Sequence, residues 1–156
     1  MTLTIENGTG VPGADSFVTV AEYEAFVLAY FGETVAGDEG ALRRSFVVMS
    51  NMPWNGDLWP TFCDEIPDAV KNAQMAIARV EDQSPGSLSP VFNKSQGKVL
   101  TAVGPIQWTP RAAPNTIEAA RPVVTMALDF LKSARGECWA GGLLEDSGGV
   151  TWLKRA

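Results

Sequence analysis

A glycine-rich stretch near the N-terminus restricts what the first twenty residues can form. Gly8, Gly10 and Gly13 match the G-x-G-x-x-G pattern of dinucleotide-binding loops. That function needs a strand, a tight turn and a helix that opens at once inside a βαβ unit. Pro12 removes an N–H from the loop, no helix can begin before Thr19, and more helix follows instead of a second strand. The stretch therefore predicts an irregular arm that leads into the first helix, and dinucleotide binding is disfavoured.

The composition is typical of one globular domain. The chain has 156 residues, of which 46% are hydrophobic and 19% are charged, so it can bury a core and is not wholly disordered. It contains no apolar run of about 18 residues that could span a membrane. The N-terminus also lacks the basic flank and apolar centre of a signal peptide. We therefore expect an intracellular protein with no membrane partner.

The chain contains no histidine, which removes several classes of chemistry. Ser-His-Asp and Cys-His catalysis and a histidine base are excluded. Zinc would need unusual ligands, because Cys63 and Cys138 form no C-x-x-C motif and are expected to be free, partly buried thiols. The adjacent acids at 64–65 and 145–146 are typical of solvated surface. We predict no catalytic, cofactor-binding or metal-binding residues, so an enzyme is disfavoured.

The net charge of −6 is unevenly distributed along the sequence. Residues 1–66 carry ten acids and two bases, whereas residues 67–156 carry eight acids and ten bases. A protein that binds DNA tightly needs clustered Lys and Arg side chains that neutralise phosphates. The basic residues of the second part are scattered, so tight, generic DNA binding is disfavoured.

Four segments carry the apolar spacing of helices. Thr19 and Glu22 are placed to form a capping box for the first helix, which we expect to end at Gly32. The second helix is expected over 38–51. The third is expected over 67–82, where a proline and an acid suit the first turn.

The fourth helix is expected to start near residue 120, because Pro122 suits a first helical turn. Trp54 and Trp59, which precede the third helix, are expected to close one end of the core, with contact to a partner as the alternative. Apolar residues that recur at three- and four-residue steps are expected to face the core. In chain order they are Tyr23, Phe26, Val27, Tyr30, Phe31, Leu42, Phe46, Val47, Met49, Val70, Ala73, Ile77, Val80, Ala120, Val123, Val124, Ala127, Leu128 and Leu131.

Residues 97–109 change to the spacing of β structure. Apolar segments lie on both sides of Gly104 and Pro105, which predicts a short β-hairpin or β-arm. Because Pro105 argues against a tight primed turn, the pairing could also be with another segment or another subunit. Trp108 beside Arg111 is the local hint of a surface on which bases could stack.

The last part of the chain is predicted to be a docking tail. Residues 136–156 are rich in glycine yet carry Trp139, Trp152 and Leu153, which indicates a segment that docks on its own domain or on a neighbour. The predicted organisation is a helical domain over 1–135, with an N-terminal arm over 1–18, followed by this tail. The predicted protein-interface residues are Trp108, Arg111, Trp139, Trp152 and Leu153.

Four motifs in this order resemble a family of tailed-bacteriophage proteins. The family is labelled DnaT-like single-stranded-DNA-binding protein, and its members are similar to head–tail connector (neck adaptor) proteins. The resemblance covers roughly residues 1–133 and implies nothing for the tail after Arg135. The motifs are Glu6-Asn-Gly-Thr-Gly followed by Ala14-Asp-Ser-Phe-Val-Thr-Val20, Leu58-Trp-Pro60 before Ile66-Pro67, the alanine-rich helix that follows, and Lys98 to Pro105 before a final helix.

The resemblance implies a mainly α adaptor domain of about four helices, which forms a ring of typically twelve subunits beneath the portal of a filled capsid. Its partners would be the portal protein, a tail-side neck or tail protein, and further copies of itself. It would lie in the neck of the virion after assembly in the host cytoplasm. DNA would pass through the ring without sequence-specific binding, and an acidic wall suits that role because like charges repel.

Two other functions compete with the connector. Single-stranded-DNA binding is the alternative, and it would need an electropositive groove lined with aromatic side chains. A small-molecule enzyme is the third hypothesis, and it rests on the glycine pattern alone.

Overall fold

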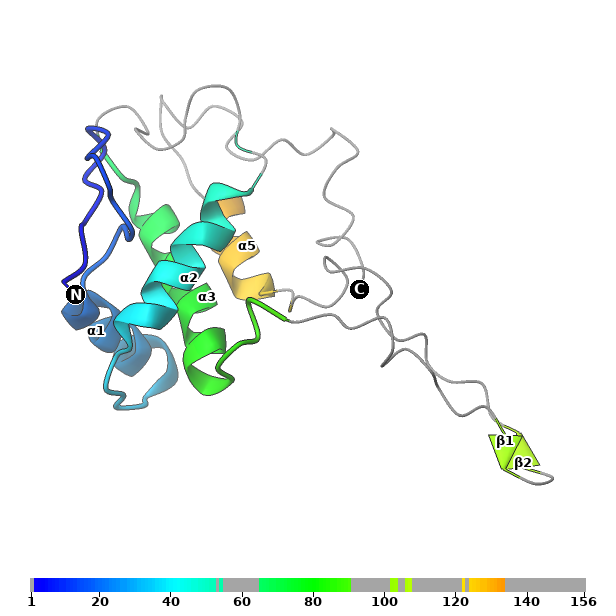
Figure 1. Cartoon of the computed structure of the whole chain (residues 1–156). Coiled ribbons are helices and arrows are strands. Elements are labelled where there is room, and N and C mark those ends of the chain that lie inside the picture. The colour runs from blue at the N-terminus through cyan, green and yellow to red at the C-terminus, as the bar shows by residue number, and fades with distance from the viewer. Residues whose placement is uncertain are drawn as a thin grey trace.

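The computed structural model describes residues 2–52, 54, 65–90, 102–103, 106–107, 122 and 124–133. Its helices are α1 (Val20–Phe31), α2 (Glu39–Ser50), α3 (Asp68–Gln83) and α5 (Thr125–Ser133). Helix α3 is central, because α1, α2 and α5 each pack against it (Figure 1). The described part of the chain therefore confirms a mainly α fold with four helices.

Both ends of α1 have the predicted caps. The Thr19 side chain accepts a hydrogen bond from the Glu22 N–H at 3.2 Å, and the Glu22 carboxylate accepts one from the Thr19 N–H at 2.7 Å. Gly32 ends the helix with a φ of 68°, and its N–H donates to the Leu28 carbonyl at 3.0 Å. A glycine adopts this left-handed conformation without the penalty that a Cβ atom would add.

Helices α2 and α3 lie within about one residue of their predicted ranges. The Asp38 carboxylate caps α2 by accepting hydrogen bonds from the N–H groups of Gly40 and Ala41. Helix α3 begins directly after Pro67, whose carbonyl accepts from the Val70 and Lys71 N–H groups. Its buried stripe contains Val70, Ala73 and Ile77, as the spacing predicts.

The prediction that the last helix starts near residue 120 is wrong. Pro122 and Val124 lie before the helix, which begins at Thr125. The Val124 carbonyl accepts hydrogen bonds from the N–H groups of Ala127 and Leu128, at 3.1 and 3.3 Å. The first turn is therefore built on Val124, and Pro122 does not occupy it as expected.

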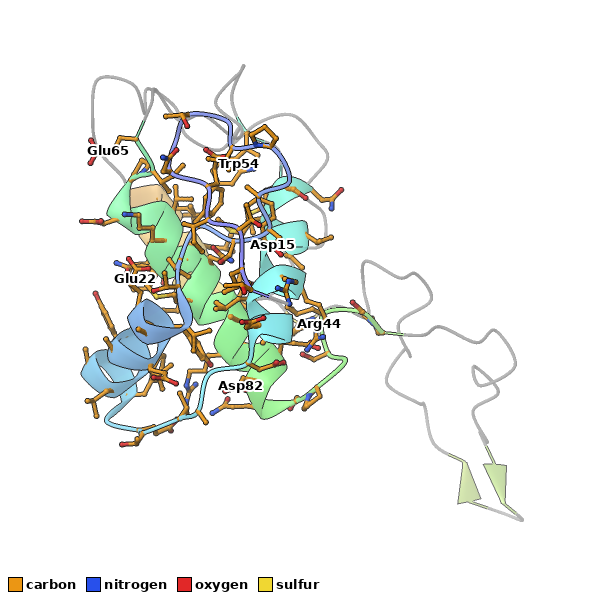
Figure 2. The ribbon with its side chains drawn as sticks, turned by 60° about the vertical axis from the view of Figure 1, so that its left-hand side comes forward. Asp15, Glu22, Arg44, Trp54, Glu65 and Asp82 are labelled. Carbon is orange, nitrogen blue, oxygen red and sulfur yellow. The ribbon has the colours of Figure 1, made fainter. Side chains whose placement is uncertain are left out.

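The core lies between α3 and the helices around it, with two departures from the predicted faces. Val47 is 57% exposed, because Val48 and Met49 provide the inner face of α2 instead. Tyr30 is 52% exposed at the end of α1. Trp54 closes one end of the core as predicted: it is buried, and its Nε1 donates to the Met49 carbonyl at 2.8 Å (Figure 2).

The predicted β segment forms a local antiparallel pair. Strand β1 (Ala102–Val103) pairs with β2 (Ile106–Gln107), with Ala102 opposite Gln107. These two segments therefore pair with each other, which is the hairpin form of the prediction. The rest of 97–109 and the predicted tail over 136–156 lie outside the described residues.

Candidate functional site

The glycine loop of the N-terminal arm surrounds the carboxylate of Glu6, an anionic side chain of the same arm. The Glu6 side chain is buried at 1% exposure. One carboxylate oxygen accepts from the N–H groups of Gly8 and Gly10 at 2.8 and 2.9 Å, and the other accepts from the Val11 N–H at 2.7 Å. Gly8 and Gly10 both have positive φ, which turns successive N–H groups toward one point. The loop is thus an anion-binding nest that holds an internal carboxylate.

This geometry explains why the glycine pattern does not behave as a dinucleotide motif. In such a motif the loop N–H groups and the start of a helix meet a pyrophosphate. Here the N–H groups of the loop are occupied by Glu6, and the first helix begins only at Val20. The arm that the sequence predicts is therefore a self-contained structural unit.

A buried glutamine on α3 fastens this arm to the helices. The Gln74 side chain is fully buried, and its oxygen accepts from the Phe17 N–H at 2.8 Å. Its amide nitrogen donates to the Ser16 hydroxyl and to the Leu42 carbonyl of α2, both at 3.0 Å. One side chain thus joins the arm, α2 and α3 at a single point.

An ion pair makes a second connection between the arm and α2. Arg43 Nε lies 2.6 Å from a carboxylate oxygen of Asp15, whose other oxygen accepts from the Thr4 N–H at 2.8 Å. Figure 2 shows Asp15 beside α2. The same guanidinium contacts Glu39 one helical turn away at 3.2 Å. Asp15 therefore links the start of the arm, at Thr4, to α2, at Arg43.

A second buried carboxylate organises the turn after α3. Glu81 accepts from the N–H groups of Gly86 and Leu88, at 2.7 and 2.8 Å, and from the Ser87 hydroxyl at 3.1 Å. Arg44 Nε approaches it to 2.6 Å. Burial alone would raise the pKa of Glu81, but these donors and the Arg44 charge outweigh burial and hold the pKa below its usual value.

The basic side chains of the described residues mostly lie against acids. These residues include twelve carboxylates and five basic side chains. Arg43, Arg44, Lys71 and Arg79 each lie within 4.0 Å of a carboxylate oxygen. The Arg79 guanidinium also lies 3.8 Å from the centre of the Phe31 ring. The described residues therefore carry an excess of negative charge, and four of their five basic side chains are paired with acids.

The predicted interface residues, namely Trp108, Arg111, Trp139, Trp152 and Leu153, lie outside the described residues. Among the residues that are described, no cluster of acids and cysteines is suited to a metal ion. None of the described helices is long and apolar enough to cross a membrane.

Sequence reasoning did not find the three buried polar anchors, Glu6, Gln74 and Glu81. A weak signal exists for the two acids, because each is followed within a few residues by glycine in a polar turn, as in Glu6-Asn-Gly-Thr-Gly. Gln74 has no such signal, because its partner Phe17 lies 57 residues away in the sequence.

Comparison with known protein families assigns the chain to one of them. Residues 1–143 match the family described as "Putative DnaT-like ssDNA binding protein", so the chain belongs to that family. This confirms the DnaT-like family that the four sequence motifs indicated, but the match lends no support to the phage neck adaptor, and its description agrees with the single-stranded-DNA-binding alternative. No curated protein and no solved structure matches the chain.

Proposed function

We propose that the protein is a structural head–tail connector of a tailed phage, which forms a ring between portal and tail through which DNA passes. The observation that carries this proposal is the pairing of the described basic side chains with acids. Four of the five lie against carboxylates, and the described residues keep an excess of negative charge. A wall of this kind lets a polyanion slide past, because it offers no cations that would hold phosphates.

The anchoring of the arm supports the same role. A connector subunit has to present its loops in a fixed geometry, since a ring multiplies many weak contacts into a stable joint. Gln74 and the pair of Asp15 with Arg43 fix the arm on the helices, and Glu6 fixes the loop within the arm. These internal contacts support a role in assembly, and the side chains that make them are occupied in holding the arm in place.

Purified virions test the connector proposal directly. We expect the protein to be detected by mass spectrometry in intact particles and to form a ring of density between portal and tail in electron micrographs. Particles assembled without it should contain filled heads that fail to join tails. Virions of normal infectivity that lack the protein would refute the proposal.

Single-stranded-DNA binding is the second candidate, because the description of the matched family names it. The described residues do not favour this function, because sites for single-stranded DNA combine aromatic side chains, on which the bases stack, with a positively charged groove. Binding would therefore have to use the residues outside the described part, where Trp108 and Arg111 are the candidates from the sequence.

Fluorescence anisotropy with labelled oligothymidine, at low and at physiological salt, separates the two candidates. A connector with an acidic wall should leave the anisotropy unchanged at micromolar protein. Salt-dependent binding that is lost in Trp108→Ala and Arg111→Ala, but kept in the control Lys132→Ala, would establish the second candidate instead. Lys132 is a suitable control because it is an exposed base on α5.

A further inference from the structure

The glycine loop of the N-terminal arm, drawn in blue in Figure 1, contains an asparagine directly before a glycine, Asn7–Gly8. This pair is chemically labile in an open chain, because the glycine nitrogen can attack the asparagine side chain and no Cβ atom of the glycine hinders the attack. Asn7 is exposed to water, whereas Gly8 is buried. The two partners of this reactive pair therefore lie in different surroundings.

The reaction of such a pair is deamidation, which consumes water and needs no redox partner. A base in solution removes the proton of the Gly8 N–H, and the nitrogen then forms a bond to Cγ of Asn7. The bond between Cγ and Nδ2 breaks, so that Nδ2 leaves as ammonia and a cyclic succinimide remains. Water opens this ring at either of its carbonyl groups and leaves aspartate or isoaspartate at position 7.

The electrophile of this reaction is already polarised in the folded protein. The Oδ1 atom of Asn7 accepts hydrogen bonds from the Thr9 N–H at 3.1 Å and from the Thr9 hydroxyl at 2.7 Å. Donors on a carbonyl oxygen stabilise the negative charge that develops there during a nucleophilic attack. The loop thus favours attack at Cγ, provided that the Gly8 nitrogen can lose its proton.

The nucleophile, in contrast, is blocked by Glu6. The Gly8 N–H donates to a carboxylate oxygen of Glu6 at 2.8 Å. Loss of the proton would place a negatively charged nitrogen against this carboxylate, and neighbouring charges of the same sign disfavour ionisation. We propose that the Glu6 carboxylate protects Asn7 from deamidation, so that Asn7 is a latent modification site that becomes reactive when the glycine loop opens. This inference is independent of the proposed function.

The modification would prevent the loop from closing again. In isoaspartate the main chain runs through the side chain, which inserts an additional carbon atom between the Cα atom of residue 7 and the Gly8 nitrogen. This insertion would move the Gly8 N–H away from Glu6, and the new carboxylate would add a negative charge beside it. An arm that carries isoaspartate at this position is therefore expected to stay open.

Peptide mapping of the full chain by mass spectrometry tests the protection, because replacement of NH₂ by OH changes the mass of the peptide that contains Asn7. The wild-type protein is incubated at neutral pH in the folded state and in urea. A hydrogen bond to a charged group is strong enough to slow a reaction by roughly tenfold or more, so Asn7 should react at least that much more slowly in the folded state. Equal rates in the two states would overturn the proposal.

Two variants separate the charge of Glu6 from the rigidity of the arm, once circular dichroism has shown that both keep the helix content of the wild type. Glu6→Gln removes the charge and should raise the rate in the folded state by about tenfold. Asp15→Ala is the matched control, because it removes the side-chain contacts with Thr4 and Arg43 and leaves Glu6 in place, so its rate should stay near that of the wild type. An unchanged rate in Glu6→Gln, or an equal acceleration in both variants, would show that Glu6 is not the protecting group.

Discussion

Replacing Glu6 with glutamine tests whether the glycine loop depends on a charged acceptor. In the wild type, the Val11 N–H donates to one carboxylate oxygen at 2.7 Å, while Gly8 and Gly10 donate to the other. An amide keeps one accepting oxygen, and its NH₂ group then faces an N–H that needs an acceptor. A hydrogen bond to a charged group contributes about 1.5–3 kcal/mol. Because part of the loop is open to water, we expect Glu6→Gln to lower the free energy of unfolding by about 2–3 kcal/mol.

Urea unfolding followed by circular dichroism at neutral pH measures this loss. The control is Glu65→Gln, which removes the charge of an exposed carboxylate just before α3 and should change the free energy of unfolding by less than about 0.5 kcal/mol. Amide hydrogen exchange at Gly8, Gly10 and Val11 reports the loop itself and should become faster in Glu6→Gln. Equal stability of the two variants, together with unchanged exchange of the loop amides, would show that the loop does not need the carboxylate.

Two further changes test the remaining anchors, Gln74 and Glu81, and a third tests the close packing at Gly37. Gln74→Leu leaves the buried Phe17 N–H without its acceptor, so urea unfolding should show a loss of about 2–4 kcal/mol, and a loss below about 1 kcal/mol would contradict the anchoring role. Gly37→Ala places a Cβ atom 2.9 Å from the Tyr23 ring, so the melting temperature should fall by several degrees, whereas an unchanged value would show that the ring can move aside. Because the folded pKa of Glu81 lies below the unfolded value near 4.5, its contribution to stability is present above pH 4.5 and is lost as the pH falls through the folded pKa. Glu81→Gln should remove that part of the acid dependence, and parallel stability curves of variant and wild type would exclude the mechanism.

The features that sequence reasoning predicted well depend on residues close together in the chain. Thr19 and Glu22 are three residues apart, and their capping box forms as expected. Gly32 ends α1 for an equally local reason, because it adopts a backbone conformation that other residues avoid. Helical period and caps are local properties, so one sequence is enough to indicate them.

The features that it missed depend on contacts across the fold. Val47 and Val48 are equally apolar neighbours, and only the packing of α2 on α3 decides that Val48 is buried and Val47 is exposed. The burial of Gln74 likewise becomes intelligible only once the Phe17 N–H is placed against it. Proline favours the first turn of a helix, but this local preference did not set the start of α5. The first hydrogen bonds of α5 are accepted by the Val124 carbonyl, two residues after Pro122.

The distribution of charge also indicates which part of the chain a DNA-binding activity would have to use. The described residues contain five of the twelve Lys and Arg side chains, and four of these five lie against acids. Freeing one of them, such as Arg44, would leave Glu81 buried beside fewer positive charges and would cost stability before phosphate binding could gain any. Binding of single-stranded DNA would therefore depend on the exposed Lys132 and on the seven bases outside the described residues. A loss of binding in Arg111→Ala would then support the family's description, whereas a wild-type protein that does not bind oligothymidine would leave the acidic surface, and with it the connector, as the better account of the chain.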